Sequence, residues 1–279
     1  MCDCDAVGSV LHTLPGSEPV FGVTSLDNLL YVLRGVKTSE QIEVYDTDSY
    51  RLQRYLTVPG LGSKDDITAC AHNSCAYISD FSNNCIHRVG LPHGADITNW
   101  PVNDVPACLS VTDTHSVLVT CIKACKIKEF GTFGKLLREI QLLEDVMSPW
   151  HTVQLSNGQF IVCHGDRGDS LQRVCLIGSD GHVVKSYSGP KGPGSQQMNL
   201  SVHLCVDRNG FVFVVDINNA RVLLLSPELT YVNDVVSRDQ LKWRPLRLSV
   251  DVDRRRLYVA VNERKDGRWT AGRVVIVTV

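Results

Sequence analysis

The chain has 279 residues, of which 43% are hydrophobic and 21% charged, and its formal net charge is −2. This is the composition of a globular protein, and the near-neutral charge excludes a polybasic chain that binds nucleic acid through bulk positive charge. No stretch approaches the roughly 18 consecutive apolar residues of a membrane-spanning helix, and residues 1–5 are acidic where a secretory signal is basic and then apolar. We therefore expect a cytoplasmic protein without a membrane partner.

The chain contains 11 cysteines, most of them inside apolar, strand-like runs. Because the count is odd and no export signal is recognised, we expect reduced thiols that pack as small hydrophobic side chains. A structural zinc site needs two pairs of ligands, and neither Cys2/Cys4 nor Cys121/Cys125 is followed by a second pair at finger or ribbon spacing. We predict no metal and no other cofactor.

The elements expected along the chain repeat one pattern: a short apolar strand, a polar turn, a second apolar strand and two further strands. The pattern is clearest over residues 204–225. The residue that opens the first strand falls, in the six copies, at Phe21, Thr68, Cys108, His151, His203 and Arg247. The spacings are 47, 40, 43, 52 and 44 residues. A period of about 40 to 50 residues that carries four strands is typical of a β-propeller blade.

Only 32 residues follow Arg247, too few for a complete blade, while residues 9–14 form a strand-like run before the first copy. We therefore predict an all-β, six-bladed β-propeller over residues 1–279, in which strand 9–14 completes the last blade (243–279) beside residues 273–277. Closure of this kind removes exposed sheet edges. The helix-like run 136–143 falls where an outer strand is due, so we predict a strand there.

Copy five carries Asp207, Asp216, Asn218 and Arg221 at the turns, and copy two keeps Asp80 and Asn83. With these residues the chain resembles NHL repeats, the propeller blades at the C-terminus of many tripartite-motif proteins. The resemblance implies that these polar residues are structural, with Asp and Asn capping turns and Arg bridging strands. No RING, B-box or coiled-coil pattern occurs, so no ubiquitin-ligase activity is implied.

The six strand-opening residues (Phe21, Thr68, Cys108, His151, His203 and Arg247) are predicted to form a ring at the mouth of the central channel. His and Cys ligate zinc and copper, and the two histidines are similar to the zinc-binding channel histidines of peptide-amidating lyases. Arg247 would place a fixed positive charge beside such a metal. No nucleophile elbow or catalytic triad is found. We expect hydrogen-bonded channel histidines and no catalytic activity.

The connections on one face of the propeller carry cationic and indole side chains. The candidate partner-binding residues are Trp150, Arg167, Lys191, Lys242, Arg244, Arg264, Arg268 and Trp269. We expect Arg264, Arg268 and Trp269 to lie in the longest loop between second and third strands and to form the main contact, without a role in stability. The Arg-Gly-Asp tripeptide at residues 167–169 is interpreted as a chance occurrence.

A rigid ring with variable loops is suited to binding, so we predict a non-catalytic module that recognises a protein or peptide partner. One alternative is a propeller that binds single-stranded RNA, as some tripartite-motif proteins do, since cations and indoles engage phosphates and unpaired bases. A second alternative is a metal-dependent propeller enzyme of the amidating-lyase type. We expect a monomer or the terminal domain of a longer chain.

Overall fold

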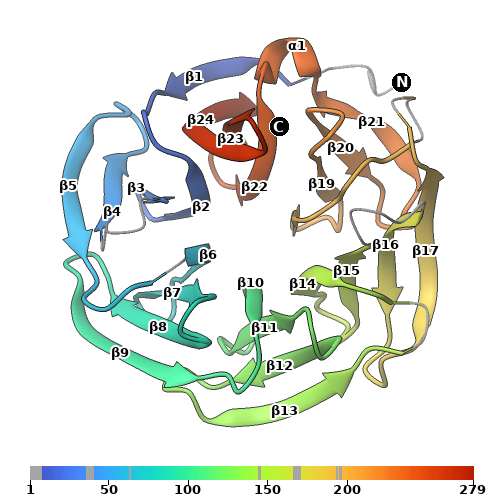
Figure 1. Ribbon diagram of the computed structural model, residues 1–279, viewed down its shortest axis with the longest axis horizontal. Coiled ribbons are helices and arrows are strands. Elements are labelled where there is room, and N and C mark those ends of the chain that lie inside the picture. The colour runs from blue at the N-terminus through green and yellow to red at the C-terminus, as the bar shows by residue number, and fades with distance from the viewer. Residues whose placement is uncertain are drawn as a thin grey trace.

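The computed structural model describes residues 8–35, 41–62, 64–143, 146–165, 171–192, 194 and 197–279, without the side chains of residues 64, 65, 171 and 188–190. The described residues form six four-stranded antiparallel sheets arranged around a central axis (Figure 1). The prediction of a six-bladed β-propeller is therefore confirmed. No helix in this part of the chain is long and apolar enough to cross a membrane.

Each sheet is one blade, and its strands run from the axis outward. The blades are blade 1, β2 (Val20–Leu26), β3 (Leu29–Arg34), β4 (Gln41–Asp46) and β5 (Leu52–Thr57); blade 2, β6 (Lys64–Cys70), β7 (Cys75–Asp80), β8 (Cys85–Gly90) and β9 (Ala95–Pro101); blade 3, β10 (Pro106–Val111), β11 (Val117–Cys121), β12 (Lys126–Phe130) and β13 (Leu136–Gln141); blade 4, β14 (Pro149–Gln154), β15 (Phe160–His164), β16 (Leu171–Ile177) and β17 (Val183–Pro190); blade 5, β18 (Leu204–Val206), β19 (Val212–Asp216), β20 (Arg221–Leu225) and β21 (Tyr231–Val236); blade 6, β22 (Arg244–Asp251), β23 (Arg256–Lys265), β24 (Arg268–Thr278) and β1 (Val10–Leu14). A short helix, α1 (Arg238–Leu241), joins blades 5 and 6.

Blade 6 is completed by the N-terminal strand, as predicted. β1 pairs antiparallel with β24, with Val10 opposite Val277 and Leu14 opposite Val274. Leu14 is 2% exposed and belongs to a buried cluster shared by blades 6 and 1. Pairing the two ends of the chain in one sheet closes the ring, because the unpaired edge of β24 receives a partner.

Two local predictions are also confirmed: the outer strand of blade 3 and the placement of proline at the start of inner strands. The helix-like run at residues 136–143 begins with β13, the outer strand of blade 3. Proline stands at the start of three inner strands, at Pro106, Pro149 and next to the first residue of β22 at Pro245. Each of these inner strands is the edge strand of its sheet, and the missing N–H of proline costs least at the start of an edge strand.

The hydrophobic core lies between neighbouring blades. The second strands are the most buried, and every residue of β7, β11, β15 and β19 is buried. Strands covered on both faces read as continuous apolar runs, whereas the outer strands alternate or are exposed. The nine cysteines in the described part of the chain carry no disulfide, in line with the expectation of reduced thiols.

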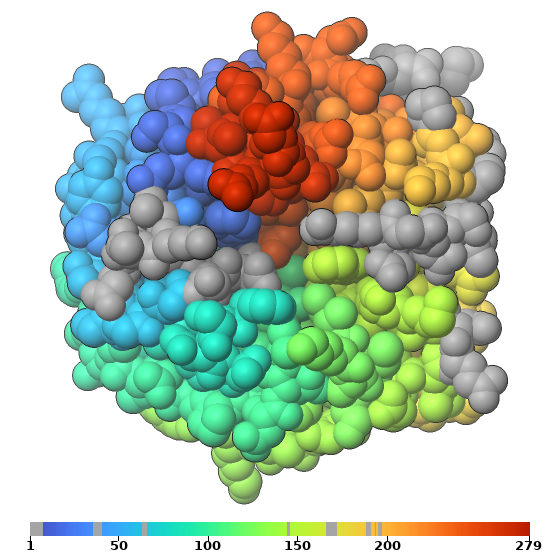
Figure 2. Space-filling model, viewed as in Figure 1, coloured from blue at the N-terminus to red at the C-terminus, as the bar shows by residue number. Residues whose placement is uncertain are grey.

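The two ends of the propeller carry different connections. We call one end the loop face: it holds the connections from each outer strand to the next blade and from the second to the third strand of each blade. The hairpin of β23 and β24, in red, projects toward the viewer in Figure 2. Connections between first and second strands, and between third and fourth strands, lie on the opposite face.

Candidate functional site

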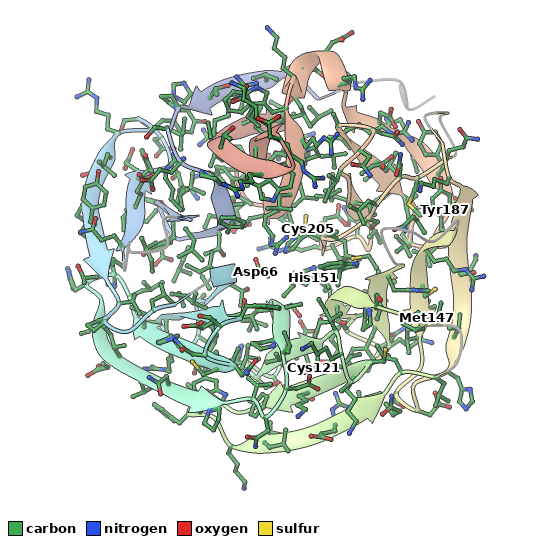
Figure 3. All side chains as sticks on the ribbon, viewed as in Figure 1. Asp66, Cys121, Met147, His151, Tyr187 and Cys205 are labelled. Carbon is green, nitrogen blue, oxygen red and sulfur yellow. The ribbon has the colours of Figure 1, made fainter. Side chains whose placement is uncertain are left out.

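The axis of the propeller is lined by one ring of residues, each at the same position of its inner strand. In the β-ladders, Gly22 pairs with Leu33, Asp66 with Ser79, His151 with Cys163 and Arg247 with Ala260. The backbone N–H of Val215 donates to the carbonyl of His203 at 2.9 Å, which places that histidine at the equivalent position. Figure 3 shows Asp66 and His151 close to the axis.

Two of the six predicted ring residues are therefore wrong. Gly22 replaces Phe21, and Asp66 replaces Thr68. The inner strands carry an irregularity just before the ring residue, between Val20 and Gly22 in β2 and between Lys64 and Asp66 in β6. The same irregularity precedes His151 in β14 and Arg247 in β22, where the prediction is right. The two errors are therefore alignment offsets of the repeat, by one residue in β2 and by two residues in β6.

Three side chains of this axial ring, Asp66, His151 and His203, each accept a backbone N–H from the inner strand of the next blade. The N–H of Leu109 donates to Asp66 Oδ2 at 2.9 Å, that of Leu204 to His151 Nδ1 at 3.3 Å, and that of Leu248 to His203 Nδ1 at 3.3 Å. Gly22 leaves room for the same approach in blade 1. A Cβ there would lie 3.0 Å from the backbone nitrogen of Ile67 and 2.7 Å from its Cγ2.

The hydrogen bonds fix the tautomers of both histidines. Because Nδ1 of each accepts a backbone N–H, it cannot carry a proton, so the proton resides on Nε2. His151 Nε2 donates to the carbonyl of Leu109 at 3.0 Å, and His203 Nε2 lies 3.5 Å from Asp66 Oδ2. The two imidazoles stack with centroids 4.0 Å apart. Both histidines are thus neutral structural groups in this arrangement.

The electrostatics of the axial ring agree with these tautomers. Burial, followed by the charges of His203 and Arg247, lowers the pKa of His151 to about 3. Burial also lowers the pKa of His203, although Asp66 opposes this. Burial alone would raise the pKa of Asp66, but His203 and Arg247 outweigh it and hold the value low. Arg247 Nε lies 3.4 Å from Asp66 Oδ1, so the buried carboxylate has a permanent counter-charge.

Asp66, Cys108 and His203 are close enough to share a metal ion, but their bonding opposes it. A metal would need the lone pair of His203 Nε2, and that nitrogen carries the proton because Nδ1 accepts the N–H of Leu248. Asp66 is already paired with Arg247. The side chains of the axial ring are therefore structural groups, hydrogen-bonded and ion-paired to one another and to the backbone.

Apolar side chains cover the axial ring on its loop-face side. Phe21 and Trp150, which precede ring residues in blades 1 and 4, pack against the same cluster as Val202 and Leu246, which precede His203 and Arg247. Trp150 also donates its indole N–H to the carbonyl of Gly165 at 3.0 Å. A cavity of about 300 Å³ lies along the axis, lined by both ring histidines and by residues beyond the ring such as Thr68 and Ser110.

The residues predicted to bind a partner fall into three groups. Trp150 packs into the core and is no surface anchor, and Arg167 lies outside the described residues together with the rest of 166–170. Lys191 and Lys242 are exposed, on different connections. The remaining four, Arg244, Arg264, Arg268 and Trp269, belong to blade 6.

The expectation of a long loop in blade 6 is wrong. β23 extends to Lys265 and β24 begins at Arg268, so only Asp266 and Gly267 form the turn, and Arg264 and Trp269 face each other in the ladder. Trp269 is half-buried and packs against the core cluster of blades 5 and 6. The expectation that Trp269 has no role in stability is therefore not supported by its packing.

Three arginines meet on this part of the loop face, and we call them the arginine cluster: Arg238 on α1, Arg244 at the start of β22 and Arg264 on β23. Arg244 donates to Asn218 Oδ1 at 2.9 Å, and Arg238 donates to the Asn218 carbonyl at 3.3 Å. Burial, followed by the charges of Arg264 and Arg238, lowers the pKa of Arg244. Within the described residues no carboxylate forms an ion pair with any of the three.

The sequence interpretation missed Arg238 and Arg273 in this region. Arg264 lies over the Trp269 ring at 5.6 Å, and Arg273 lies over the Trp243 ring at 4.5 Å. Arg238 could not have been found from the sequence, since only the turn of α1 brings it next to Asn218.

No family model matches the chain, and no curated protein matches it in sequence. Among solved structures, virginiamycin B lyase from Staphylococcus aureus has a TM-score of 0.64 and 11% identity, with 96% of this chain and 98% of that chain covered. A catalytically inactive histidine-to-alanine variant of that lyase with quinupristin gives a TM-score of 0.63 at 11% identity, covering 98% of each chain. A protein of unknown function from Bacteroides caccae has a TM-score of 0.60 and 13% identity over 83% of this chain and 96% of that chain. The likeness establishes a six-bladed β-propeller of this general shape.

Proposed function

We propose that this chain is a non-catalytic binding propeller that takes an acidic segment of a partner protein on the loop face of blade 6. The arginine cluster carries the proposal. Arg238 and Arg244 share Asn218, and Arg264 is near enough for its charge to lower the pKa of Arg244, while no carboxylate among the described residues forms an ion pair with any of the three. Guanidinium groups bind carboxylates through paired, charge-assisted hydrogen bonds, which are the strong ones at interfaces.

The mutual repulsion in the arginine cluster favours an anionic ligand. Arg244 is half-buried, and its pKa is lowered first by burial and then by Arg264 and Arg238. Like charges held together at a partly desolvated site destabilise one another, and a bound carboxylate removes that cost. Asn218 supports this arrangement by accepting from both Arg238 and Arg244, so part of the ordering entropy is already lost before binding.

The indoles of this region favour a peptide over single-stranded RNA. RNA-binding surfaces offer aromatic faces on which bases stack. Here Trp243 and Trp269 are both packed against the core cluster, and each has an arginine over its ring. The rings serve to hold Arg273 and Arg264 in place.

The axial ring supports a non-catalytic function. A general base or metal ligand needs an available imidazole lone pair, and in His151 and His203 that lone pair accepts a backbone N–H. The resemblance to NHL repeats of tripartite-motif proteins, which was drawn from the turn residues, is consistent with a binding function. At 11% identity, the likeness to virginiamycin B lyase is a likeness of the fold alone.

The proposal is tested by selecting a random peptide display library on the immobilised chain. We expect peptides rich in Asp and Glu to be enriched on the wild type and lost on the double variant Arg244→Gln/Arg264→Gln. The matched control is Arg51→Gln/Arg208→Gln, which removes two exposed positive charges from the opposite face. A weakening of at least about tenfold, or about 1.4 kcal/mol, is expected for selected peptides on the first variant alone.

Equal loss of acidic peptides on both variants would show attraction by net charge and would contradict a specific site. Enrichment of peptides that lack acidic residues would show that peptides bind at a site other than the arginine cluster. A labelled single-stranded RNA run in parallel decides the alternative: RNA bound by the wild type, with an affinity that falls steeply with salt, would support the RNA-binding function instead.

A further inference from the structure

We propose that Asp80, Cys85 and His87, at the loop-face end of blade 2, form a binding site for one Zn²⁺ ion. Asp80 ends β7, and Cys85 and His87 lie on the neighbouring strand β8. His87 Nε2 lies 3.2 Å from Asp80 Oδ2 and 3.5 Å from Cys85 Sγ, and all three donor atoms lie within 4.8 Å of one another. This site is separate from the axial ring and from the arginine cluster.

The equivalent position in blade 5 shows what is different about blade 2. Asp216 pairs across the ladder with Arg221, as Asp80 pairs with Cys85. Arg221 Nε donates to Asp216 Oδ2 at 3.0 Å, so the buried carboxylate of blade 5 has a cation beside it. In blade 2 a thiol occupies the position of that guanidinium.

The carboxylate of Asp80 is buried without a fixed counter-charge. Its side chain is 0% exposed, and in the described part of the chain its ion-pair partner is His87, with no Lys or Arg within 4.0 Å. Asp216 is equally buried but has Arg221. Hydrogen bonds from Gly62, Ser82 and Asn83 stabilise this carboxylate, and a divalent cation would add the full counter-charge that these neutral donors lack.

The hydrogen bonds around His87 do not satisfy the three groups without an ion. One ring nitrogen, Nε2, faces both the Asp80 carboxylate and the Cys85 sulfur, and it has either a single hydrogen or a single lone pair to offer. The other nitrogen, Nδ1, is buried and has no hydrogen-bond partner. No backbone N–H therefore holds Nδ1 as an acceptor, in contrast to both axial histidines, so Nδ1 is able to carry the proton and leave Nε2 as a ligand.

The spacing of the donor atoms fits tetrahedral zinc. With Zn–N and Zn–O near 2.1 Å and Zn–S near 2.3 Å, tetrahedral angles separate nitrogen from oxygen by about 3.4 Å and nitrogen from sulfur by about 3.6 Å. The observed separations are 3.2 and 3.5 Å. Binding displaces the thiol proton of Cys85 to solvent, which leaves a thiolate, a carboxylate and a neutral imidazole as ligands.

The surrounding residues already orient the carboxylate as they would for a metal ligand. Backbone N–H groups of Gly62 and Asn83 donate to Asp80 at 2.7 and 3.0 Å, and the Asn83 amide donates to Oδ2 at 2.9 Å. Outer partners of this kind hold a metal ligand in position. Three protein ligands leave a fourth tetrahedral position, which a water or a partner side chain can take.

The first experiment measures bound metal in the full chain after equilibration with Zn²⁺ and removal of the unbound ion. We expect about one zinc per chain, and a dissociation constant raised by more than about 100-fold in Cys85→Ala, since even outer-shell changes cost 10- to 100-fold. Cys125→Ala is the matched control, because Cys125 is a half-buried cysteine at the corresponding turn of blade 3. Cys108→Ala tests the axial cluster and is expected to retain the zinc.

A second variant restores the pattern of blade 5. Cys85→Arg should place a guanidinium beside Asp80, as Arg221 lies beside Asp216, and should abolish zinc binding while the protein stays folded. Co²⁺ gives an independent readout: the wild type should show thiolate-to-cobalt charge transfer and tetrahedral bands, and Cys85→Ala should not.

The proposal is overturned if the folded wild type retains no zinc under these conditions, or if Cys85→Ala and Cys125→Ala bind equally. Loss of zinc in Cys108→Ala alone would assign the metal to the axial cluster. These readouts are separate from peptide capture at the arginine cluster, so either proposal can fail without the other.

Discussion

Blades 5 and 2 hold an aspartate at the same place and compensate its charge differently. Asp216 accepts the N–H of Asn199 at 2.8 Å and the Asn219 amide at 2.7 Å, and Asp80 accepts the N–H of Gly62 and the Asn83 amide in the same way. The turn therefore requires the carboxylate in both blades. The fold does not fix the counter-charge: it is Arg221 in blade 5, whereas in blade 2 Cys85 and His87 lie beside the carboxylate without a fixed positive charge.

The comparison also corrects one residue of the expected repeat pattern. The repeat pattern predicts Asn218 as the turn asparagine of copy five, but Asn219 donates to Asp216 and corresponds to Asn83. Asn218 instead bonds to Asn199 Oδ1 and accepts from Arg244. Its role lies in the arginine cluster, beyond the blade itself.

The largest expected effect comes from removing the counter-charge of blade 5. Arg221→Met should lower the free energy of unfolding by about 3–5 kcal/mol, because it leaves Asp216 buried and unpaired. It also removes donors to the carbonyls of Gly194 and Gln197. Urea denaturation followed by tryptophan fluorescence measures the change.

The control for this prediction is Arg208→Met, which breaks an ion pair whose side chains are about 70% exposed. Exposed pairs contribute about 0–1 kcal/mol. Equal losses in the two variants would mean that Arg221 acts as a surface residue, and the contrast between blades 5 and 2 would no longer hold.

A smaller difference is expected between two matched changes at the aspartates themselves. Both Asp216→Asn and Asp80→Asn replace one carboxylate oxygen with an amide NH₂ group. In both blades the side chain is surrounded by a backbone N–H donor and an asparagine amide donor. Asp216→Asn additionally removes the buried carboxylate beside Arg221 Nε and leaves Asp234 as the remaining carboxylate partner of that guanidinium among the described residues, so in metal-free protein it should cost about 1–2 kcal/mol more. A larger loss in Asp80→Asn would show that His87 is a full counter-charge for Asp80 without metal.

The smallest effect is a pH dependence that originates at the axial ring, outside both turns. His151 has an ordinary pKa of 6.5 when unfolded and about 3 when folded. The unfolded chain therefore binds the proton first, so stability should fall as the pH drops below about 6.5, by at most about 1.4 kcal/mol per pH unit for this histidine.

His151→Asn tests the pH dependence because its amide oxygen can still accept the N–H of Leu204 but does not titrate. We expect a shallower loss of stability between pH 6.5 and pH 5 than in the wild type, measured by urea denaturation at each pH. His182→Asn, at an exposed histidine, is the matched substitution. An unchanged slope in His151→Asn would mean that His151 is already protonated in the folded ring.

The amount that could be predicted differs between the fold and the sites. The blade period and the closing strand follow from apolar runs and turn residues, which report local structure. Cys85 and His87 carry a readable signal, since residues two apart on a strand share a face, and Asp80 stands opposite Cys85 across a tight turn. The arginine cluster has no such signal, because α1 and two strands of blade 6 meet only in the folded ring.

The sequence by itself determined six blades, the outer strand at residues 136–141 and closure by the N-terminal strand, because periodicity and chain length depend on each segment and its neighbours. Only the tertiary structure decided which residues face the axis and which charges have partners. Asp66 and Thr68 lie two residues apart on the same face of β6, and only the pairing of Asp66 with Ser79 shows that Asp66 is the one level with the other ring residues. Its carboxylate lies beside Arg247, 181 residues later in the chain, and no local pattern encodes a contact of that separation.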